Sequence, residues 1–205
     1  EEITLRAPRI AVLGMDCAVG KRTTARMLVE ACNASGLAAE MIYTGQTGWM
    51  QGSRFGIVLD SIVNDFVCGE LEHALVSCEA ELAPDVMVLE GQSALRNPSG
   101  PCGSELLLAG GAQSVVLQHV PGRRWFDGHE GHAIPSVASE IELISFYGAR
   151  TLAVTLNGEG LSAAELVRTQ RELEHTLGIP VIRPLEEGLG RLVPFVRELM
   201  AQAKR

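Results

Sequence analysis

Short apolar runs alternate along the chain with longer segments in which apolar residues recur at helical spacing. The strand-like runs are 9–14, 37–45, 84–91, 112–120, 149–157 and 179–184. The helix-like segments are 21–36, which Gly36 closes, 137–147, 162–176 and 189–203. Because strands and helices alternate at this spacing, we predict an α/β fold of three layers, with a mainly parallel sheet covered by helices on both faces.

A longer helix is predicted between Leu59 and Leu82. Its apolar residues stand at positions 59, 62, 63, 66, 67, 71, 74, 75, 78 and 82. That spacing fits about six turns of α-helix. On such a helix Asp60 and Asn64 would share one face, and Asp65 would lie on another side.

Four connecting segments follow predicted strands at their carboxyl ends, where sheets of this kind bind ligands. These segments are 14–20, 44–56, 91–103 and 119–135. The second is rich in Gly and too long for a plain connector. The fourth belongs to a long stretch that we predict to be a polar loop.

Composition narrows the class of protein. The 205 residues suffice for one domain over 1–205, and the opening "EEITLRAP" lacks a Met, which suggests a piece or the last domain of a longer protein. A net charge of −8 argues against binding to nucleic acid or a membrane surface. Five Cys residues without a CxxC pair indicate reduced thiols in the cytoplasm and no zinc site.

The segment "GMDCAVGKRTT" (14–24) joins the first predicted strand to the first helix. Gly14 and Gly20 permit tight turns and close approach of the backbone, and Lys21 adds a positive charge at the helix N-terminus. We therefore predict a phosphate-binding loop, the P-loop or Walker A motif. The candidate cofactor-binding residues are Gly14, Asp16, Cys17, Ala18, Val19, Gly20, Lys21, Arg22, Thr23 and Thr24.

Two details set this loop apart. Five residues separate its two glycines instead of four, and Arg22 follows Lys21 where a Ser or Thr normally binds magnesium. The loop resembles the "GTDTxVGK" loop of dethiobiotin synthetase, in which Thr follows Lys directly. Here Thr23 and Thr24 come one and two positions later, and adjacent helix positions differ by about 100°. Phosphate binding follows from this loop, whereas magnesium binding does not.

Further motifs extend the resemblance. "GMDCAVGKRTTA", "YTGQTGWMQG", "NDFVCGELE" and "LEGQSAL" with the later "PSG" resemble the P-loop domain of a family labelled as a domain of unknown function. Some members carry the label NAD-dependent epimerase or dehydratase. One branch is D-glutamate N-acetyltransferase, which moves an acetyl group from acetyl-CoA to the amine of D-glutamate.

The resemblance implies a small-molecule substrate, acetyl-CoA as cofactor, and an upstream Rossmann-like domain, which longer members carry. It also favours a homo-oligomer, because P-loop proteins of this sort often place active sites near a dimer face. A P-loop can hold the phosphates of coenzyme A without cleaving them, so such a site needs no metal ion.

Acetyl transfer requires a base that takes a proton from the acceptor amine. The candidate catalytic groups are Asp60, Asp65, Glu90 and His119. Glu90 ends a predicted strand beside the P-loop, and a capping carboxylate is the alternative interpretation. The candidate substrate-binding residues are Gln46, Trp49, Asn64, Gln92 and Arg123. A Trp can stack on adenine, and an Arg fork can bind a carboxylate.

Two other patterns have a simpler interpretation. "HEGH" (129–132) has an HxxH spacing, but its glycine indicates a loop, and we predict no metal site. Cys17 could carry an acetyl group, although a small packing residue is the simpler interpretation.

Three functional hypotheses therefore stay open. The first is a coenzyme A-dependent N-acyltransferase acting on an acidic amino acid. The second is an ATP-dependent ligase or kinase of the dethiobiotin synthetase type, which would use Mg-ATP. The third is a non-catalytic nucleotide-binding domain. An NAD-dependent dehydrogenase is disfavoured, because "GMDCAVGK" is not a GxGxxG motif.

Overall fold

The computed structural model describes residues 5–203, and each of the six predicted apolar runs contains a strand. The main sheet contains β1 (Arg9–Gly14), β2 (Ala39–Tyr43), β3 (Phe55–Gly56), β4 (Val86–Glu90), β5 (Ser114–His119), β8 (Arg150–Leu156) and β9 (Val181–Ile182). The α-helices are α1 (Lys21–Ala34), α2 (Gln46–Met50), α3 (Val67–Leu82), α4 (Ser104–Leu108), α5 (Val137–Phe146), α6 (Ala163–Leu177), α7 (Pro184–Glu187) and α8 (Val193–Ala203).

The main sheet has the strand order β3-β2-β4-β1-β5-β8-β9, and its neighbouring strands are parallel. Val12 of β1 pairs with Glu90 of β4, and Gly14 pairs with Gln118 of β5. The carboxyl ends of the three central strands therefore meet at one edge. The P-loop and the segments that follow Glu90 and His119 all begin at this edge.

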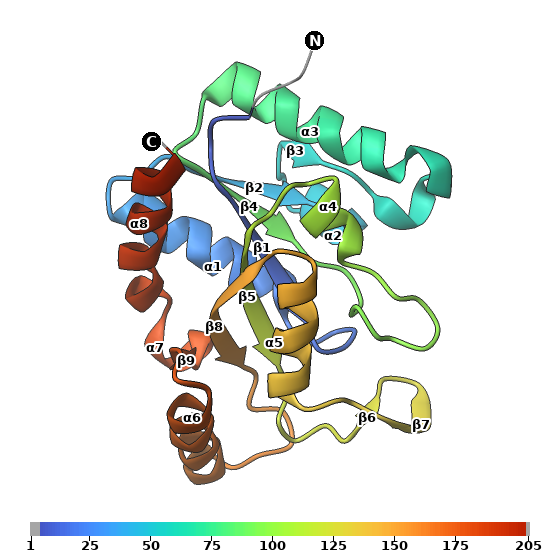
Figure 1. The fold of residues 1–205 in the computed structure, drawn as a ribbon, viewed down its shortest axis with the longest axis vertical. Helices are drawn as coiled ribbons and strands as arrows, with labels where there is room; N and C mark the ends of the chain where they lie inside the picture. Colours follow the sequence, from blue (N-terminus) through green and yellow to red (C-terminus); the bar gives the residue numbers. More distant parts are fainter. Residues whose placement is uncertain (1–4, 204–205) are drawn as a thin grey trace.

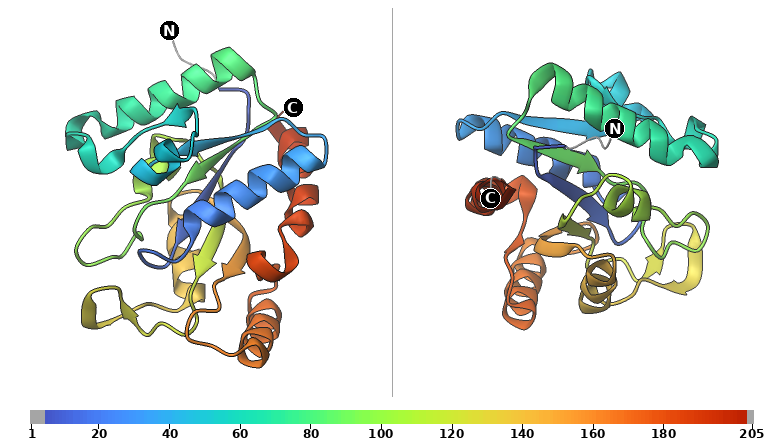
Figure 2. Two further views of the ribbon diagram at one scale, coloured as in Figure 1. Left: turned by 180° about the vertical axis from the view of Figure 1, so that it is seen from behind. Right: turned by 45° about the horizontal axis from the view of Figure 1, so that its top comes forward.

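Helices cover both faces of the sheet, as predicted. On one face, α3, α4, α5 and α6 pack against alternate strand residues such as Leu89 and Leu117. On the other face, α1 and α8 pack against residues such as Val88 and Val116. Figure 1 shows α4 and α5 in front of the sheet, and Figure 2 shows α1 and α8 from behind. The alternation of side chains along each strand separates these two apolar layers.

The predicted helix from Leu59 to Leu82 is wrong in its first third. The α-helix α3 begins at Val67, and two short 3₁₀ turns, Leu59–Ser61 and Asn64–Phe66, precede it. Asp, Ser and Asn in this stretch favour turns because their side chains compete for backbone hydrogen bonds. The Ser61 hydroxyl, for example, donates to the Val58 carbonyl at 2.7 Å. Asp60 and Asn64 consequently do not share a helix face.

Two of the predicted loops contain regular structure. Segment 44–56 holds α2 and β3, and the predicted polar loop after β5 holds a hairpin of β6 (Trp125–Phe126) and antiparallel β7 (His129–Ala133). "HEGH" therefore lies on a strand, and the prediction of a loop there is wrong. The short helix α4, which follows segment 91–103, has no predicted counterpart.

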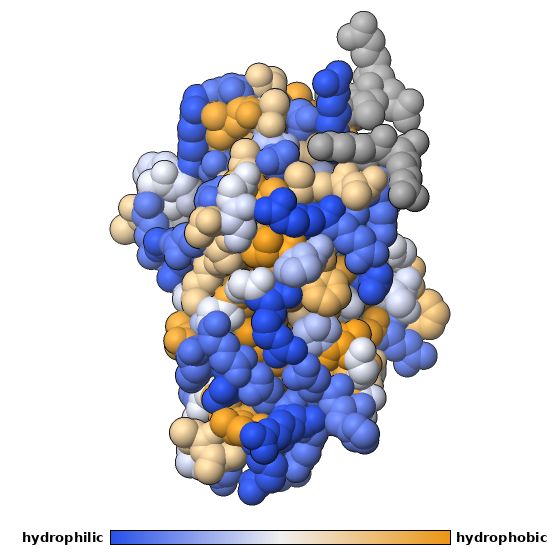
Figure 3. Space-filling view, turned by 90° about the vertical axis from the view of Figure 1, so that its left-hand side faces the viewer, coloured by the Kyte–Doolittle hydropathy of each residue, from blue (hydrophilic) through white to orange (hydrophobic). Residues whose placement is uncertain are grey.

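The surface mixes apolar and polar residues. Figure 3 shows the side of the molecule seen from the left of Figure 1, where polar residues interrupt the apolar areas. Within residues 5–203, none of the helices has the length and apolar character that crossing a bilayer requires.

Candidate phosphate-binding site

The P-loop turns tightly between β1 and α1. Ala18 and Gly20 have φ values of +53° and +105°, in the region that favours glycine. The first helical hydrogen bond runs from the Thr24 amide to the Gly20 carbonyl at 3.0 Å. The preceding amides at the start of α1 therefore have no partner within the helix and can bind an anion.

Lys21 is held inside this turn. A Cβ atom on Gly14 would come within 2.7 Å of the Lys21 Cδ, so the glycine provides the space for the lysine chain. The Lys21 Nζ donates to the carbonyls of Asp16 at 2.7 Å and Ser93 at 2.8 Å. Burial lowers the pKa of Lys21 to about 8, because the ammonium has lost most of its water. An anion beside it would favour the protonated form.

A pocket of about 370 Å³ opens beside the P-loop. Its walls come from the P-loop, the first turn of α1 and the segment after β4: Cys17, Ala18, Val19, Gly20, Lys21, Arg22, Thr23, Glu90, Gly91, Gln92 and Ser93. The pocket thus joins most of the predicted cofactor-binding residues to two of the other candidates, Glu90 and Gln92.

Glu90 is buried at the end of β4. Its Oε2 accepts from the Thr44 amide at 3.2 Å, and its carbonyl accepts from the Thr44 hydroxyl at 2.6 Å. Burial raises the pKa of Glu90, and the Thr44 amide and the charges of Arg22 and Lys21 oppose this effect only in part. A carboxylate with a raised pKa beside a pocket is suited to accepting a proton.

The two threonines of the P-loop face different surroundings. Thr24 is buried, and its hydroxyl donates to the Gln118 Oε1 at 2.5 Å, where the Thr155 hydroxyl donates at 2.7 Å. Thr23 is exposed at the rim of the pocket. Arg22, at the position after the lysine, lines the pocket itself.

Asp16 is fully buried and does not line the pocket. Its carboxylate accepts from the Arg123 Nη1 and the Asp127 amide, both at 2.8 Å, and from the Asn97 Nδ2 at 3.3 Å. Arg123 also pairs with Glu159 at 3.1 Å. We call Asp16, Asn97, Arg123 and Asp127 the Asp16 cluster. It ties the P-loop to the segments that follow β4 and β5.

The Asp16 cluster changes the interpretation of two predicted residues. Asp16 was predicted to bind the cofactor and Arg123 to bind the substrate, yet each side chain is engaged by the other. Sequence reasoning did not single out Asn97, or Ser93, whose φ of +40° lies in the left-handed region. Both occur in segment 91–103, so their position after a strand end was the available signal.

Cys17 lies between the pocket and the Asp16 cluster. Its thiol donates to the Ser93 hydroxyl at 3.3 Å and accepts from the Asn97 amide nitrogen at 3.6 Å. These contacts hold the side chain against segment 91–103.

Five of the predicted site residues do not line the pocket. Asp60, Asn64 and Asp65 are exposed in the 3₁₀ turns before α3. Gln46 and Trp49 are exposed on α2, and the Trp49 side chain keeps 62% of its accessible surface.

His119 ends β5 on the face that carries Leu117, opposite the face that Gln118 shares with α1. Burial lowers the pKa of His119 to about 4, so the imidazole is neutral at pH values above that. Its Nδ1 is buried and has no hydrogen-bond partner in the part of the chain that is described. His119 is absent from the pocket walls.

The histidines of "HEGH" serve the hairpin. His129 Nε2 lies 2.8 Å from the Ser99 hydroxyl, and the His129 and His132 rings meet edge to face with centroids 6.2 Å apart. Across residues 5–203, no three or more His, Cys, Asp or Glu side chains are grouped in a way that could hold a metal ion.

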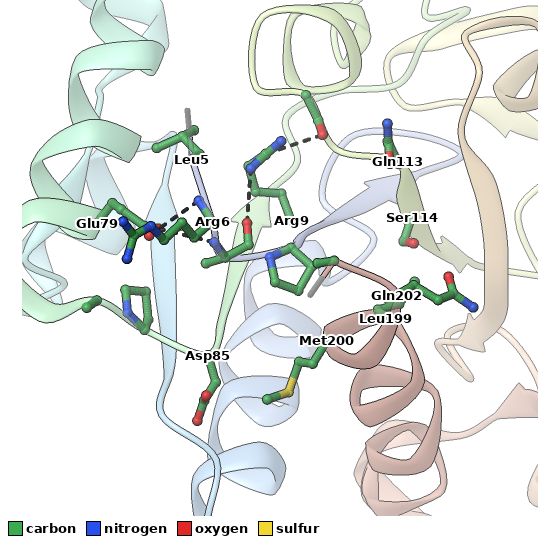
Figure 4. Close-up of a pocket in the computed structure, with 16 residues that line it drawn as sticks. Leu5, Arg6, Arg9, Glu79, Asp85, Gln113, Ser114, Leu199, Met200 and Gln202 are labelled. Carbon is green, nitrogen blue, oxygen red and sulfur yellow. Dashed lines mark hydrogen bonds between the residues drawn. The ribbon is translucent and has the colours of Figure 1, made fainter. Parts of the chain in front are cut away.

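A larger cavity, of about 690 Å³, lies at the opposite edge of the sheet, between the start of β1 and the ends of α3 and α8. Glu79 accepts from the backbone amides of Arg6 and Ala7, and Arg9 donates to the Gly111 carbonyl. Figure 4 shows Glu79 and Arg9 in the cavity wall. Both groups are used to hold chain segments together. We therefore place the candidate site at the P-loop, where the first amides of α1 have no partner within the helix and the Lys21 ammonium keeps one of its three donors for a ligand.

Sequence relatives carry the name of an enzyme. A D-glutamate N-acetyltransferase of Tritonibacter scottomollicae is 29% identical over 200 residues, which cover 92% of this chain and 57% of that protein. One from a Pseudoalteromonas species is 27% identical over 201 residues, covering 92% and 58%. The chain thus spans a little more than half the length of these curated relatives.

Solved structures share the fold. A DUF1611 family protein from Anabaena variabilis matches with a TM-score of 0.84 and 23% identity, covering 97% of this chain and 58% of that one. A nucleotide-binding protein of Archaeoglobus fulgidus in complex with ADP matches with a TM-score of 0.54 and 14% identity over 97% and 87%. Cobyrinic acid a,c-diamide synthase of Mycobacterium smegmatis, with bound ADP and magnesium, matches with 0.53 and 16% over 97% and 93%.

A family model also matches most of the chain. Residues 1–193 match the P-loop domain described as a domain of unknown function, DUF1611_C. That match includes the P-loop, Glu90 and the whole Asp16 cluster. The chain therefore belongs to the DUF1611 family, through its P-loop domain.

Proposed function

We propose that the pocket beside the P-loop binds acetyl-CoA and that the protein transfers the acetyl group to the amine of an acidic amino acid such as D-glutamate. The observation that carries this proposal is the buried Glu90 carboxylate in the wall of the same pocket as the P-loop. The names of the two curated relatives support the choice of reaction.

The residues of the pocket fit the phosphates of coenzyme A. Free amides at the start of α1, with Lys21 and Arg22, provide donors and positive charge for a pyrophosphate or a 3′-phosphate. Gly91, in the pocket wall, packs against β1, where a Cβ atom would collide with the Val12 carbonyl. Bound acetyl-CoA would supply the thioester whose carbonyl carbon reacts.

Glu90 would act on the acceptor. An ammonium group has no free electron pair, so a base must remove a proton before the nitrogen can form a bond to the acetyl carbon. The raised pKa of Glu90 makes its carboxylate a stronger base than an exposed glutamate. When the new C–N bond forms, the C–S bond breaks and the electron pair leaves with the sulfur.

The acceptor's own carboxylates need partners in the site. Arg123 was expected to serve, but its guanidinium is bound to Asp16 and Glu159. The amide of Gln92 lies in the pocket wall and is the donor that we assign to the acceptor. Its side chain packs over Gly45, where a Cβ would meet the Gln92 Nε2 at 2.4 Å.

An ATP-dependent ligase or kinase is the second candidate. Two solved proteins of similar fold hold ADP, one with magnesium and the other with cobalt. The residues of α1 argue against this candidate. Arg22 occupies the position of the Ser or Thr that normally binds magnesium, and the Thr24 hydroxyl is hydrogen-bonded to Gln118. A non-catalytic nucleotide-binding domain is the third possibility, and the experiment below separates all three.

The test combines binding and turnover on the purified chain. Calorimetry with acetyl-CoA and with Mg-ATP identifies the ligand, and release of free thiol with D-glutamate, L-glutamate or D-aspartate measures transfer. We expect Glu90→Gln to lower kcat by about a hundredfold or more while the affinity for acetyl-CoA stays within about twofold. Glu72→Gln, at an exposed position on α3, is the matched control.

Mg-ATP binding without acetyl-CoA binding would replace the transferase with the ligase or kinase. Acetyl-CoA binding with no thiol release from any of the three acceptors would favour the non-catalytic domain. An unchanged kcat in Glu90→Gln would show that Glu90 is not the base in the reaction.

A further inference from the structure

The residue after the P-loop lysine determines how the negative charge of bound phosphates is neutralised. In nucleotide-hydrolysing P-loops a Ser or Thr there binds the magnesium ion that neutralises the phosphates. Here Arg22 holds that position, and the hydroxyls of Thr23 and Thr24 lie at the rim and against Gln118. At the position of the usual hydroxyl ligand the pocket therefore presents a guanidinium.

Arg22 is free to meet a ligand. It lines the pocket, and its guanidinium forms no hydrogen bond or ion pair with any other part of residues 5–203. Arg26, one turn further along α1, differs in this respect, because it bonds to Gln51 at 3.1 Å and pairs with Glu30 at 3.6 Å. The charge of Arg22 already acts inside the pocket, where it opposes the rise in the pKa of Glu90.

The charges of the pocket also suit an anion that comes without a metal. Lys21 and Arg22 are the cationic side chains in its walls, and Glu90 is the carboxylate. With the amides of α1, they give the phosphate side of the pocket a net positive character. A guanidinium presents a fork that can bind two phosphate oxygens at once, as a metal ion bridges two. A magnesium ion brought with a ligand would meet repulsion from both cations.

We propose that Arg22 takes the place of magnesium, so that the pocket binds pyrophosphate-bearing adenine carriers without a metal and selects against Mg-nucleoside triphosphates. This inference rests on the proposed function only in taking the P-loop pocket as the phosphate site. It names Arg22 as the residue that determines which phosphate compounds the pocket accepts.

The test measures how metal affects binding. Acetyl-CoA and ADP are titrated into the wild-type chain and into Arg22→Thr, each in EDTA and in excess magnesium. For the wild type we expect both affinities to agree within about twofold in the two conditions. For Arg22→Thr we expect metal-free affinity to fall by about tenfold or more, and magnesium to recover ADP binding.

Two further variants complete the design. Arg26→Thr removes a cation from the same helix outside the pocket and should bind as the wild type does. Arg22→Lys keeps the charge without the fork and should fall between wild type and Arg22→Thr. Thermal unfolding of each variant establishes that the chain folds, which we expect because the Arg22 side chain forms no hydrogen bond or ion pair within residues 5–203.

Three results would overturn the inference: wild-type binding that disappears in EDTA, an Arg22→Thr variant that keeps its metal-free affinity, or no binding of either ligand to the wild type. Failure of the proposed function gives a different pattern. In that case acetyl-CoA or ADP binds without metal and depends on Arg22, but no acetyl group is transferred.

Discussion

The affinity of the pocket for anions should fall as the pH rises through about 8. In the free protein burial lowers the pKa of Lys21 to about 8. A bound phosphate favours the ammonium and returns the pKa towards its ordinary value of about 10.5. Between these two values binding must be accompanied by uptake of a proton. The affinity is therefore highest below about pH 8 and is lost progressively above it.

The magnitude follows from the two pKa values. At about pH 7 most Lys21 side chains are protonated in both states, so ionisation costs little. At about pH 9 roughly one side chain in ten is protonated in the free protein, and the dissociation constant rises about tenfold, or about 1.4 kcal/mol. The lowered pKa of Lys21 also affects the stability of the folded protein. The unfolded chain binds the proton more tightly, so the free energy of unfolding rises between about pH 8 and pH 10.5, by up to about 3 kcal/mol.

Calorimetry with acetyl-CoA at several pH values checks this reasoning, and buffers of different ionisation enthalpy report the proton uptake directly. Because thiols also lose protons in alkaline solution, Cys17→Ser serves as the background, since Cys17 lies in the same pocket. Lys21→Arg keeps its charge at all these pH values and should show no such dependence. An affinity that stays constant from about pH 7 to about pH 9 in the Cys17→Ser background would refute the argument.

Three other predictions concern the surroundings of the pocket. Arg123→Met leaves the buried Asp16 carboxylate without its cation and should lower the free energy of unfolding by about 3 kcal/mol in urea titrations; Asp16→Asn in addition should restore part of that loss. Gly14→Ala should weaken acetyl-CoA binding by about tenfold, because its Cβ would displace the P-loop lysine, and unchanged binding would contradict the close contact. Asp60→Ala and Asp65→Ala should each change the free energy of unfolding by less than about 0.5 kcal/mol and leave acetyl transfer within about twofold, whereas a hundredfold loss would return either residue to the chemistry.

Much of the fold could be predicted because its causes are local. Each buried strand of a parallel sheet is a short apolar run, and each covering helix carries one apolar stripe, so both are visible in the sequence. The same alternation placed Lys21 in the turn and helix start after the first strand and Glu90 at the carboxyl end of a later strand, and the structure does bring them to one pocket. The segment from Leu59 to Phe66 was predicted wrongly because its apolar spacing is helical while its Asp, Ser and Asn residues form turns.

The rest of the site depends on contacts between distant residues. Asp16 and Arg123 each looked like a ligand-binding residue, because a buried ion pair and a binding site use the same residue types. Their pairing across the molecule is set by the path of the segments after β4 and β5, which no local pattern records. The position of His119 was equally hard to predict. A shift of one residue along a strand moves a side chain to the other face of the sheet, and His119 lies on the face opposite Gln118.

The Asp16 cluster makes this P-loop hard to transplant. A grafted "GMDCAVGK" in another protein would bury a carboxylate that needs Asn97, Arg123 and the Asp127 amide around it. The reverse exchange, a standard loop placed into this chain, would leave the Arg123 guanidinium without its buried partner. The P-loop, the segment after β4 and the β6–β7 hairpin therefore depend on one another and should change together in evolution. In this family we expect insertions or replacements in one of them to succeed only when the other two change with it.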